Sequence, residues 1–105
     1  MQLLIRAPDV EELPSLSELC MRSKAAWGYD AAFMAACRGE LSFHPRDLAS
    51  SRIAVAVRGD SLLGVAQVRA TGSEADLQKL FVEPATLRSG VGRALFAWAT
   101  GAARD

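Results

Sequence analysis

The 105-residue sequence lacks a net charge, because twelve Lys and Arg residues are balanced by twelve Asp and Glu residues. Binding along a nucleic-acid backbone depends on a concentrated basic face, so this balance argues against a nucleic-acid partner. The sequence also lacks an apolar run of the roughly 20 residues that a transmembrane helix needs. We therefore expect one small soluble domain over residues 1–105, with no membrane partner.

Cysteine is scarce, and no signal peptide is recognisable. Cys20 and Cys37 both fall in helix-like stretches without C-x-x-C spacing. Buried free thiols are the favoured interpretation, with a disulfide or a metal pair as the alternative. Arg6 and Asp9 interrupt the N-terminal apolar stretch before it reaches the length of a secretory signal. These features lead us to expect a reducing, cytoplasmic setting.

Helical periodicity dominates the first half of the chain. A short apolar run, Leu3–Arg6, suits an edge strand, and Asp9 with Glu12 has the spacing of a capping box that opens a helical pattern. Pro14 allows two interpretations, a kinked helix or a helix that begins with Pro14 in its first turn. A second helix is predicted over residues 30–38, with Gly39 as its stop signal.

Alternating periodicity replaces the helical pattern after Arg52. Two alternating runs flank the turn sequence Gly59-Asp60-Ser61, which predicts an antiparallel hairpin. A third strand is predicted over Ala75–Val82. Its Leu77 and Leu80 are three residues apart, so either a bulge near Gln78-Lys79 places them on one face or the strand is buried on both faces.

The sequence that follows the third strand has the properties of an anion-binding turn. Apolar residues at helical spacing predict a helix from about Val91. The first amides of a helix have no intrahelical partner and carry partial positive charge, so they attract phosphate. Glycine at positions 90 and 92 removes side chains that would shield those amides, and two arginines flank the turn. The turn reads Arg88-Ser89-Gly90-Val91-Gly92-Arg93.

Two better-known phosphate loops do not fit this turn. A Walker loop ends in Gly-Lys-Ser/Thr, whereas Arg93 and Ala94 follow the second glycine here. The dinucleotide fingerprint needs a third small residue where this chain has Leu95. That fingerprint also belongs to a parallel βαβ unit, whereas the turn here follows a predicted antiparallel hairpin.

The residues from Leu80 to Phe96 resemble the cofactor-binding motif of the GNAT superfamily of acyl-CoA N-acyltransferases. In that family an apolar strand ending in Val-x-Pro leads to Arg/Gln-x-x-Gly-x-Gly/Ala and a helix. This chain has Leu80-Phe81-Val82-Glu83-Pro84, followed by the glycine-bearing turn and helix. The resemblance implies an α+β fold with a mixed sheet and the order β-α-α-β-β-β-α.

The resemblance also implies a set of residues that bind acetyl-CoA. Amides of Gly90, Val91, Gly92 and Arg93, next to Ser89, would hold the diphosphate. Backbone groups around Leu80, Phe81 and Val82 would pair with the pantetheine arm. Leu87 departs from the family, which has Arg or Gln there, so Arg88 is expected to supply the charge from the next position. The implied activity is transfer of an acetyl or acyl group to an amine of a small molecule or peptide.

Residues for proton transfer are few, and we identify no catalytic residue from the sequence. Tyr29 is the single tyrosine, favoured as a packing residue beside Trp27, and His44 is expected in a solvated connecting loop. Glu74 and Asp76, at the start of the third strand, are expected to be solvated.

Family members normally continue with further C-terminal strands and a helix. We therefore expect an apparently truncated domain, a fragment or a natural half-domain, that forms a homodimer through the exposed edge of its third strand. The alternative function is a non-catalytic module of the same fold that binds coenzyme A or serves in assembly.

Overall fold

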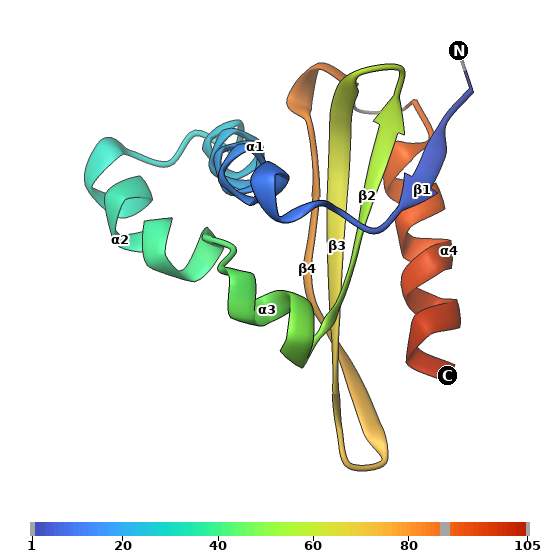
Figure 1. The fold of residues 1–105 in the computed structure, drawn as a ribbon. Helices are drawn as coiled ribbons and strands as arrows, with labels where there is room; N and C mark the ends of the chain where they lie inside the picture. Colours follow the sequence, from blue (N-terminus) through green and yellow to red (C-terminus); the bar gives the residue numbers. More distant parts are fainter. Residues whose placement is uncertain (1, 87–88, 105) are drawn as a thin grey trace.

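A four-stranded sheet separates the helices into two layers (Figure 1). The computed structural model describes residues 2–86 and 89–104. The elements in chain order are β1 (Leu4–Arg6), η1 (Val10–Glu12), α1 (Leu13–Ala25), α2 (Ala31–Leu41), α3 (Pro45–Ser50), β2 (Arg52–Arg58), β3 (Ser61–Thr71), β4 (Glu74–Val82), η2 (Pro84–Thr86) and α4 (Val91–Arg104). The predicted α+β class is confirmed.

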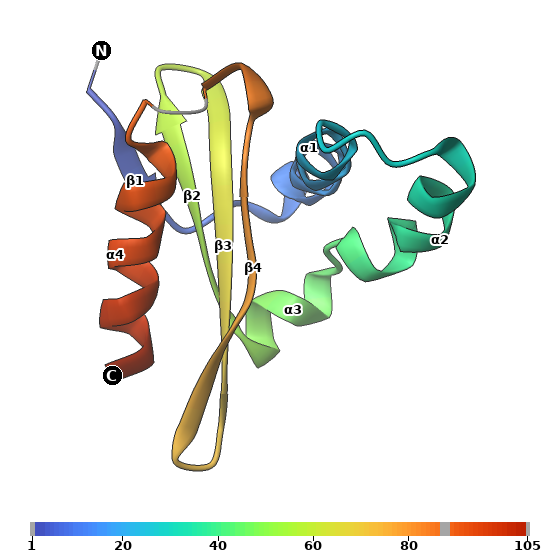
Figure 2. The same cartoon turned by 180° about the vertical axis from the view of Figure 1, so that it is seen from behind.

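The strand order is β1-β2-β3-β4, and all three pairings are antiparallel. Helices α1 to α3 lie on one side of the sheet and α4 lies alone on the other, as the reverse view in Figure 2 also shows. Each layer has its own core. The larger one joins Leu16 and Leu19 of α1 to Val55 and Val65 of the sheet, and the smaller one joins α4 to the opposite face.

The start of α1 settles the question raised by Pro14. The helix begins at Leu13, with Pro14 in its first turn, so the second interpretation is correct. The capping box predicted for Asp9 and Glu12 is present, but it caps the 3-10 turn η1 that precedes α1. Both cysteines are buried free thiols, as predicted.

Two predictions about the helical half were wrong. Asp30 caps α2 as expected, accepting a hydrogen bond from the Phe33 amide at 2.8 Å, but Gly39 does not end the helix. The helix runs on to Leu41 because that side chain is buried in the core, which outweighs the cost of an internal glycine. The expected connecting loop around His44 contains the short helix α3, whose first turn holds Pro45.

Of the two alternatives for the third strand, the structure shows the bulge. Lys79 lies opposite Gln67 and Leu77 lies opposite Val68, so Gln78 is the extra residue on β4. As expected for a bulge, Leu77 and Leu80 both lie on the α4 side of the sheet, where they join two neighbouring groups of apolar residues.

Gly64 on β3 lets α4 approach the sheet closely. A β-carbon at this position would lie 2.7 Å from Leu95 Cδ1, 3.0 Å from Val91 Cγ1 and 3.1 Å from the Phe81 carbonyl oxygen. Val91 and Leu95 are fully buried there. This contact fixes the beginning of α4 against the end of β4.

We expect Gly64→Ala to destabilise the fold by about 1–3 kcal/mol, because the added methyl overpacks the contact with α4. Gly101→Ala, within α4 itself, is the control, since a β-carbon at this position meets nothing within 4 Å. It should stabilise the protein by about 0.5–1 kcal/mol. Urea denaturation measures both changes, and equal stability of the two variants would contradict this account of the packing.

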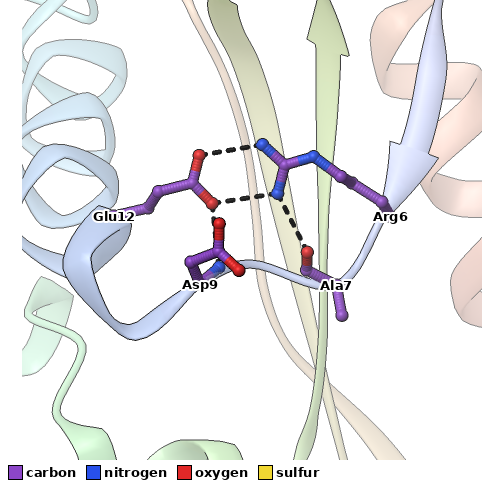
Figure 3. Close-up of polar contacts among 4 residues, drawn as sticks. All are labelled: Arg6, Ala7, Asp9 and Glu12. Atoms are coloured by element: carbon purple, nitrogen blue, oxygen red, sulfur yellow. Dashed lines mark hydrogen bonds and ion pairs between the residues drawn. The ribbon is translucent and has the colours of Figure 1, made fainter.

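An ion pair holds the strand β1 to the turn that begins the helical layer. Figure 3 shows Arg6 donating from both terminal nitrogens to the Glu12 carboxylate, each at 2.9 Å, and from Nη1 to the Ala7 carbonyl. The Asp9 amide also donates to Glu12, at 2.9 Å. Together these hydrogen bonds, that of Arg6 foremost, lower the pKa of Glu12 from 4.5 to about 2.

Because the pKa of Glu12 is lowered in the folded state, its contribution to stability is present above about pH 4.5 and is lost as the pH falls towards 2. Glu12→Gln should cost about 1 kcal/mol at neutral pH, the scale of an exposed ion pair. The difference in the free energy of unfolding between Glu12→Gln and the parent protein should become smaller as the pH falls from 4.5 towards 2. Urea midpoints measured at several pH values test this, and a difference independent of pH would refute it.

Candidate cofactor-binding site

Gly90 forms the N-cap of α4 and has a backbone that other residues rarely adopt. Its φ is +92°, and its carbonyl accepts the first helical hydrogen bond, from the Ala94 amide at 3.0 Å. The amides of Val91, Gly92 and Arg93 therefore form the first turn, where helical geometry supplies no partner. The sequence prediction of a helix that begins at Val91, directly after a glycine turn, is confirmed.

Gly92 lies beside the end of β4. A β-carbon at this position would be 3.5 Å from Val82 Cγ2, an ordinary contact distance. Packing therefore does not require glycine at position 92, whereas the positive φ at Gly90 favours glycine there. The first turn of α4 and the last residue of β4 are thus in direct proximity, which brings the helical amides next to the edge of the sheet.

The edge of β4 offers backbone groups to a ligand. Within the described residues, no strand pairs with the side of β4 that faces away from β3. The Glu83 amide donates to the Leu63 carbonyl at 2.8 Å, and antiparallel ladders alternate between inward and outward groups. By this alternation Phe81 directs its N–H and C=O towards β3, while Leu80 and Val82 direct theirs to the open edge.

The chain between β4 and α4 is held by a series of hydrogen bonds. The Glu83 carbonyl accepts from the Thr86 amide at 2.9 Å and from its hydroxyl at 2.8 Å. The Thr86 carbonyl in turn accepts from the amide and the hydroxyl of Ser89. Leu87 and Arg88 lie outside the described residues, so the charge expected from Arg88 stays a prediction.

Arg22 and Glu83 form an ion pair that the sequence did not predict. The Arg22 Nη2 atom lies 2.7 Å from Glu83 Oε2, and Nε lies 3.2 Å from each carboxylate oxygen. The hydrogen bond with Glu83 raises the pKa of the Arg22 guanidinium. The residues are 61 positions apart in the chain, so no local pattern could have paired them.

The side chains considered for proton transfer do not form one cluster. Tyr29 stacks on Phe33 with ring centroids 4.5 Å apart, and Trp27, its expected neighbour, is 81% exposed. His44 caps α3, while Glu74 and Asp76 are exposed on β4. None of these four candidates is hydrogen-bonded to another. Burial raises the pKa of the Cys20 thiol to about 12, so it is protonated and unsuited to act as a nucleophile.

Within residues 2–86 and 89–104, no group of three or more His, Cys, Asp and Glu residues could hold a metal ion. In the same ranges no helix has the length and apolar character to cross a membrane. The described part of the site thus consists of the first-turn amides of α4 and the open edge of β4.

The sequence matches no protein-family model and no curated protein. The fold, in contrast, is similar to solved acetyltransferase structures. PaiA N-acetyltransferase from Thermoplasma acidophilum, in complex with coenzyme A, has a TM-score of 0.81 at 18% identity over 99% of this chain. A GCN5-related N-acetyltransferase from Ralstonia eutropha JMP134 has a TM-score of 0.71 at 19% identity over 95%.

The ribosomal-protein-S18-alanine N-acetyltransferase from Escherichia coli is a third similar structure, with a TM-score of 0.65 at 18% identity over 92% of this chain. This chain spans 73%, 74% and 56% of the lengths of these three proteins, in the order given. The predicted resemblance is confirmed at the level of the fold: the chain has the GNAT fold.

Proposed function

We propose that this chain, which has the GNAT fold, binds the coenzyme A moiety of an acyl thioester and transfers the acyl group to an amine. The observation that carries the proposal is the meeting of two features at Val82. The first-turn amides of α4 suit a diphosphate, and the open edge of β4 suits an amide-bearing arm. Coenzyme A carries both groups in sequence.

The diphosphate would be held by the amides of Gly90, Val91, Gly92 and Arg93, with the Arg93 side chain adding positive charge. Leu80 and Val82 would pair with the pantetheine arm through the N–H and C=O groups that they direct to the open edge. Phe81 would support this site from within the sheet, because its own backbone groups face β3.

The bulge lies further along the same edge and suits the reacting centre. Gln78 has no opposite residue in β3, which frees backbone from the ladder. An amide there would polarise the thioester carbonyl while the amine attacks. The carbon–sulfur bond then breaks as the amide bond forms, the amine loses its proton to a base or water, and the thiolate takes up a proton.

Thermal shift in the presence of acetyl-CoA, coenzyme A and NAD tests the cofactor assignment. A ligand at about a hundred times its Kd stabilises a protein by roughly 2.7 kcal/mol. For a domain of this size that raises Tm by about 10 °C or more. We expect this shift with acetyl-CoA and coenzyme A but not with NAD. Stabilisation by none of them would refute the assignment.

Gly90→Leu should abolish the shift, since it strains the cap and covers the first-turn amides. Gly28→Leu is a matched control, because Gly28 also has a positive φ, +88°, and open space around it. It should cost similar stability yet keep coenzyme A binding. Consumption of acetyl-CoA with an amine panel then separates an acyltransferase from a module that only binds the cofactor.

We also propose that two copies associate through the open edge of β4, since an unpaired strand can pair with its own copy across a twofold axis. Beside this edge Leu77 is 45% exposed and Phe96 is 59% exposed. A second copy would compete with pantetheine for the backbone groups of Leu80 and Val82.

Light scattering coupled to size exclusion should therefore give a dimer without ligand and a shift towards monomer with excess coenzyme A. Phe96→Lys should weaken the dimer in the same way, because it places charge in the apolar contact. A stable monomer at all concentrations would contradict the proposed association and leave the proposed activity untouched.

A further inference from the structure

Glu83 is the residue at which the sheet, α1 and the turn towards α4 meet. Its amide closes the last rung of the sheet on Leu63, and its carbonyl accepts both hydrogen bonds from Thr86. Its carboxylate accepts hydrogen bonds from Nε and Nη2 of Arg22, which lies in the last turn of α1. A change at this side chain therefore bears on the end of β4 and on the residues Pro84–Thr86 that follow it.

The segment from Glu83 to Val91 is anchored on opposite sides of the sheet at its two described ends. Arg22 holds its start on the α1 side, whereas burial of Val91 against Gly64 holds its end on the α4 side. Figure 1 shows that β4 ends and α4 begins at the same end of the sheet. The orientation of the first-turn amides thus depends on two anchors, one ionic and one apolar.

The ion pair with Arg22 also neutralises the negative charge of Glu83, which would repel an anionic ligand. Glu83 directly follows Val82, the residue whose backbone groups we assign to the ligand. Its side chain is 23% exposed, and its carboxylate contacts Arg22. Without that partner, an unpaired negative charge would remain on the residue next to Val82, which opposes the binding of an anionic ligand there.

We propose that Arg22 is a positioning residue for the cofactor site, which fixes and neutralises Glu83 so that the first turn of α4 faces an anionic ligand. The inference rests on the proposed function. It adds a residue of the opposite helical layer to a site otherwise built from β4 and α4.

The chain contains a matched control for this ion pair. Arg38 and Glu18 form a pair of 2.8 Å that also involves α1, with both side chains about half exposed, as Arg22 is. Glu18 lies on α1, where its charge also acts on Arg22, whereas Arg38 lies on α2 and donates to Glu18, so replacing Arg38 takes no hydrogen-bond partner from Glu83. Any general effect of losing a surface ion pair on the helical layer should be the same for both.

The test compares Arg22→Gln, Glu83→Gln, the double variant and Arg38→Gln by calorimetric titration with coenzyme A. An exposed ion pair affects such equilibria by up to roughly fivefold. We expect Arg22→Gln to weaken binding by about that factor, since it leaves Glu83 both free and charged. Glu83→Gln and the double variant should each lose about twofold or less, and Arg38→Gln should bind as the parent protein does.

Arg22→Lys should restore most of the loss, because lysine supplies the charge without the bidentate geometry. Hydrogen exchange without ligand gives an independent measure of the anchor. We expect faster exchange over residues 84–94 in Arg22→Gln but not in Arg38→Gln. If the parent protein failed to bind coenzyme A while this exchange pattern held, the proposed function would fall and the anchoring role of Arg22 would stand.

Unchanged binding and unchanged exchange in Arg22→Gln would overturn the inference. So would equal losses in Arg22→Gln, Glu83→Gln and the double variant, because they would show that the charge left on Glu83 has no effect on the ligand.

Discussion

The approach of α4 to β3 at Gly64 is the contact on which the candidate site depends. Without a side chain at this position, Val91 and Leu95 can reach the sheet and become fully buried. Because Val91 is the first residue of the helix, this burial sets where the helix begins as well as how it packs. The partial positive charge of the helix N-terminus is thereby held at the end of β4 rather than elsewhere along the sheet.

The geometry at that end of the sheet favours a ligand with two different parts. Helical amides favour a compact anion, while an open strand edge favours an extended chain that carries its own amide groups. The two surfaces join where Gly92 lies beside Val82. A free phosphate would use the first surface alone, and an extended peptide would use the second alone. A ligand that joins a diphosphate to an amide-bearing arm uses both, which is the physical reason for favouring coenzyme A.

Sequence reasoning succeeded where one local signal determined the outcome. The glycines with the apolar stripe located the start of α4, and the spacing of Leu77 and Leu80 raised the bulge as one of two alternatives, which the register with β3 then decided. It failed where distant burial competed with a local signal, as when the core position of Leu41 carried α2 past Gly39. The short helix α3 was missed, although His44 and Asp47 have the spacing of a capping box and Pro45 lies in the first turn.

The candidate site also combines features that local sequence determines with features that only the fold determines. The helix start after a glycine turn could be predicted, because both are properties of a few consecutive residues, whereas anion binding there stays a prediction. The assignment of Leu80 and Val82 to the open edge needed the register with β3, which a single strand does not reveal. The pair of Arg22 with Glu83 needed the fold itself, since 61 positions separate the two residues.

The distribution of ion pairs explains how a chain without net charge can present an anion site. Four arginines among the described residues lie within 4 Å of a carboxylate: Arg6, Arg22, Arg38 and Arg69. Their charge is therefore largely neutralised by ion pairs that join one element to another. Arg93, in the first turn of α4, has no such carboxylate in the described residues. Local positive potential therefore arises there from the helical amides and one uncommitted guanidinium. Selectivity of the proposed site for an anionic ligand would then depend on the orientation of the backbone amides rather than on the net charge of the chain.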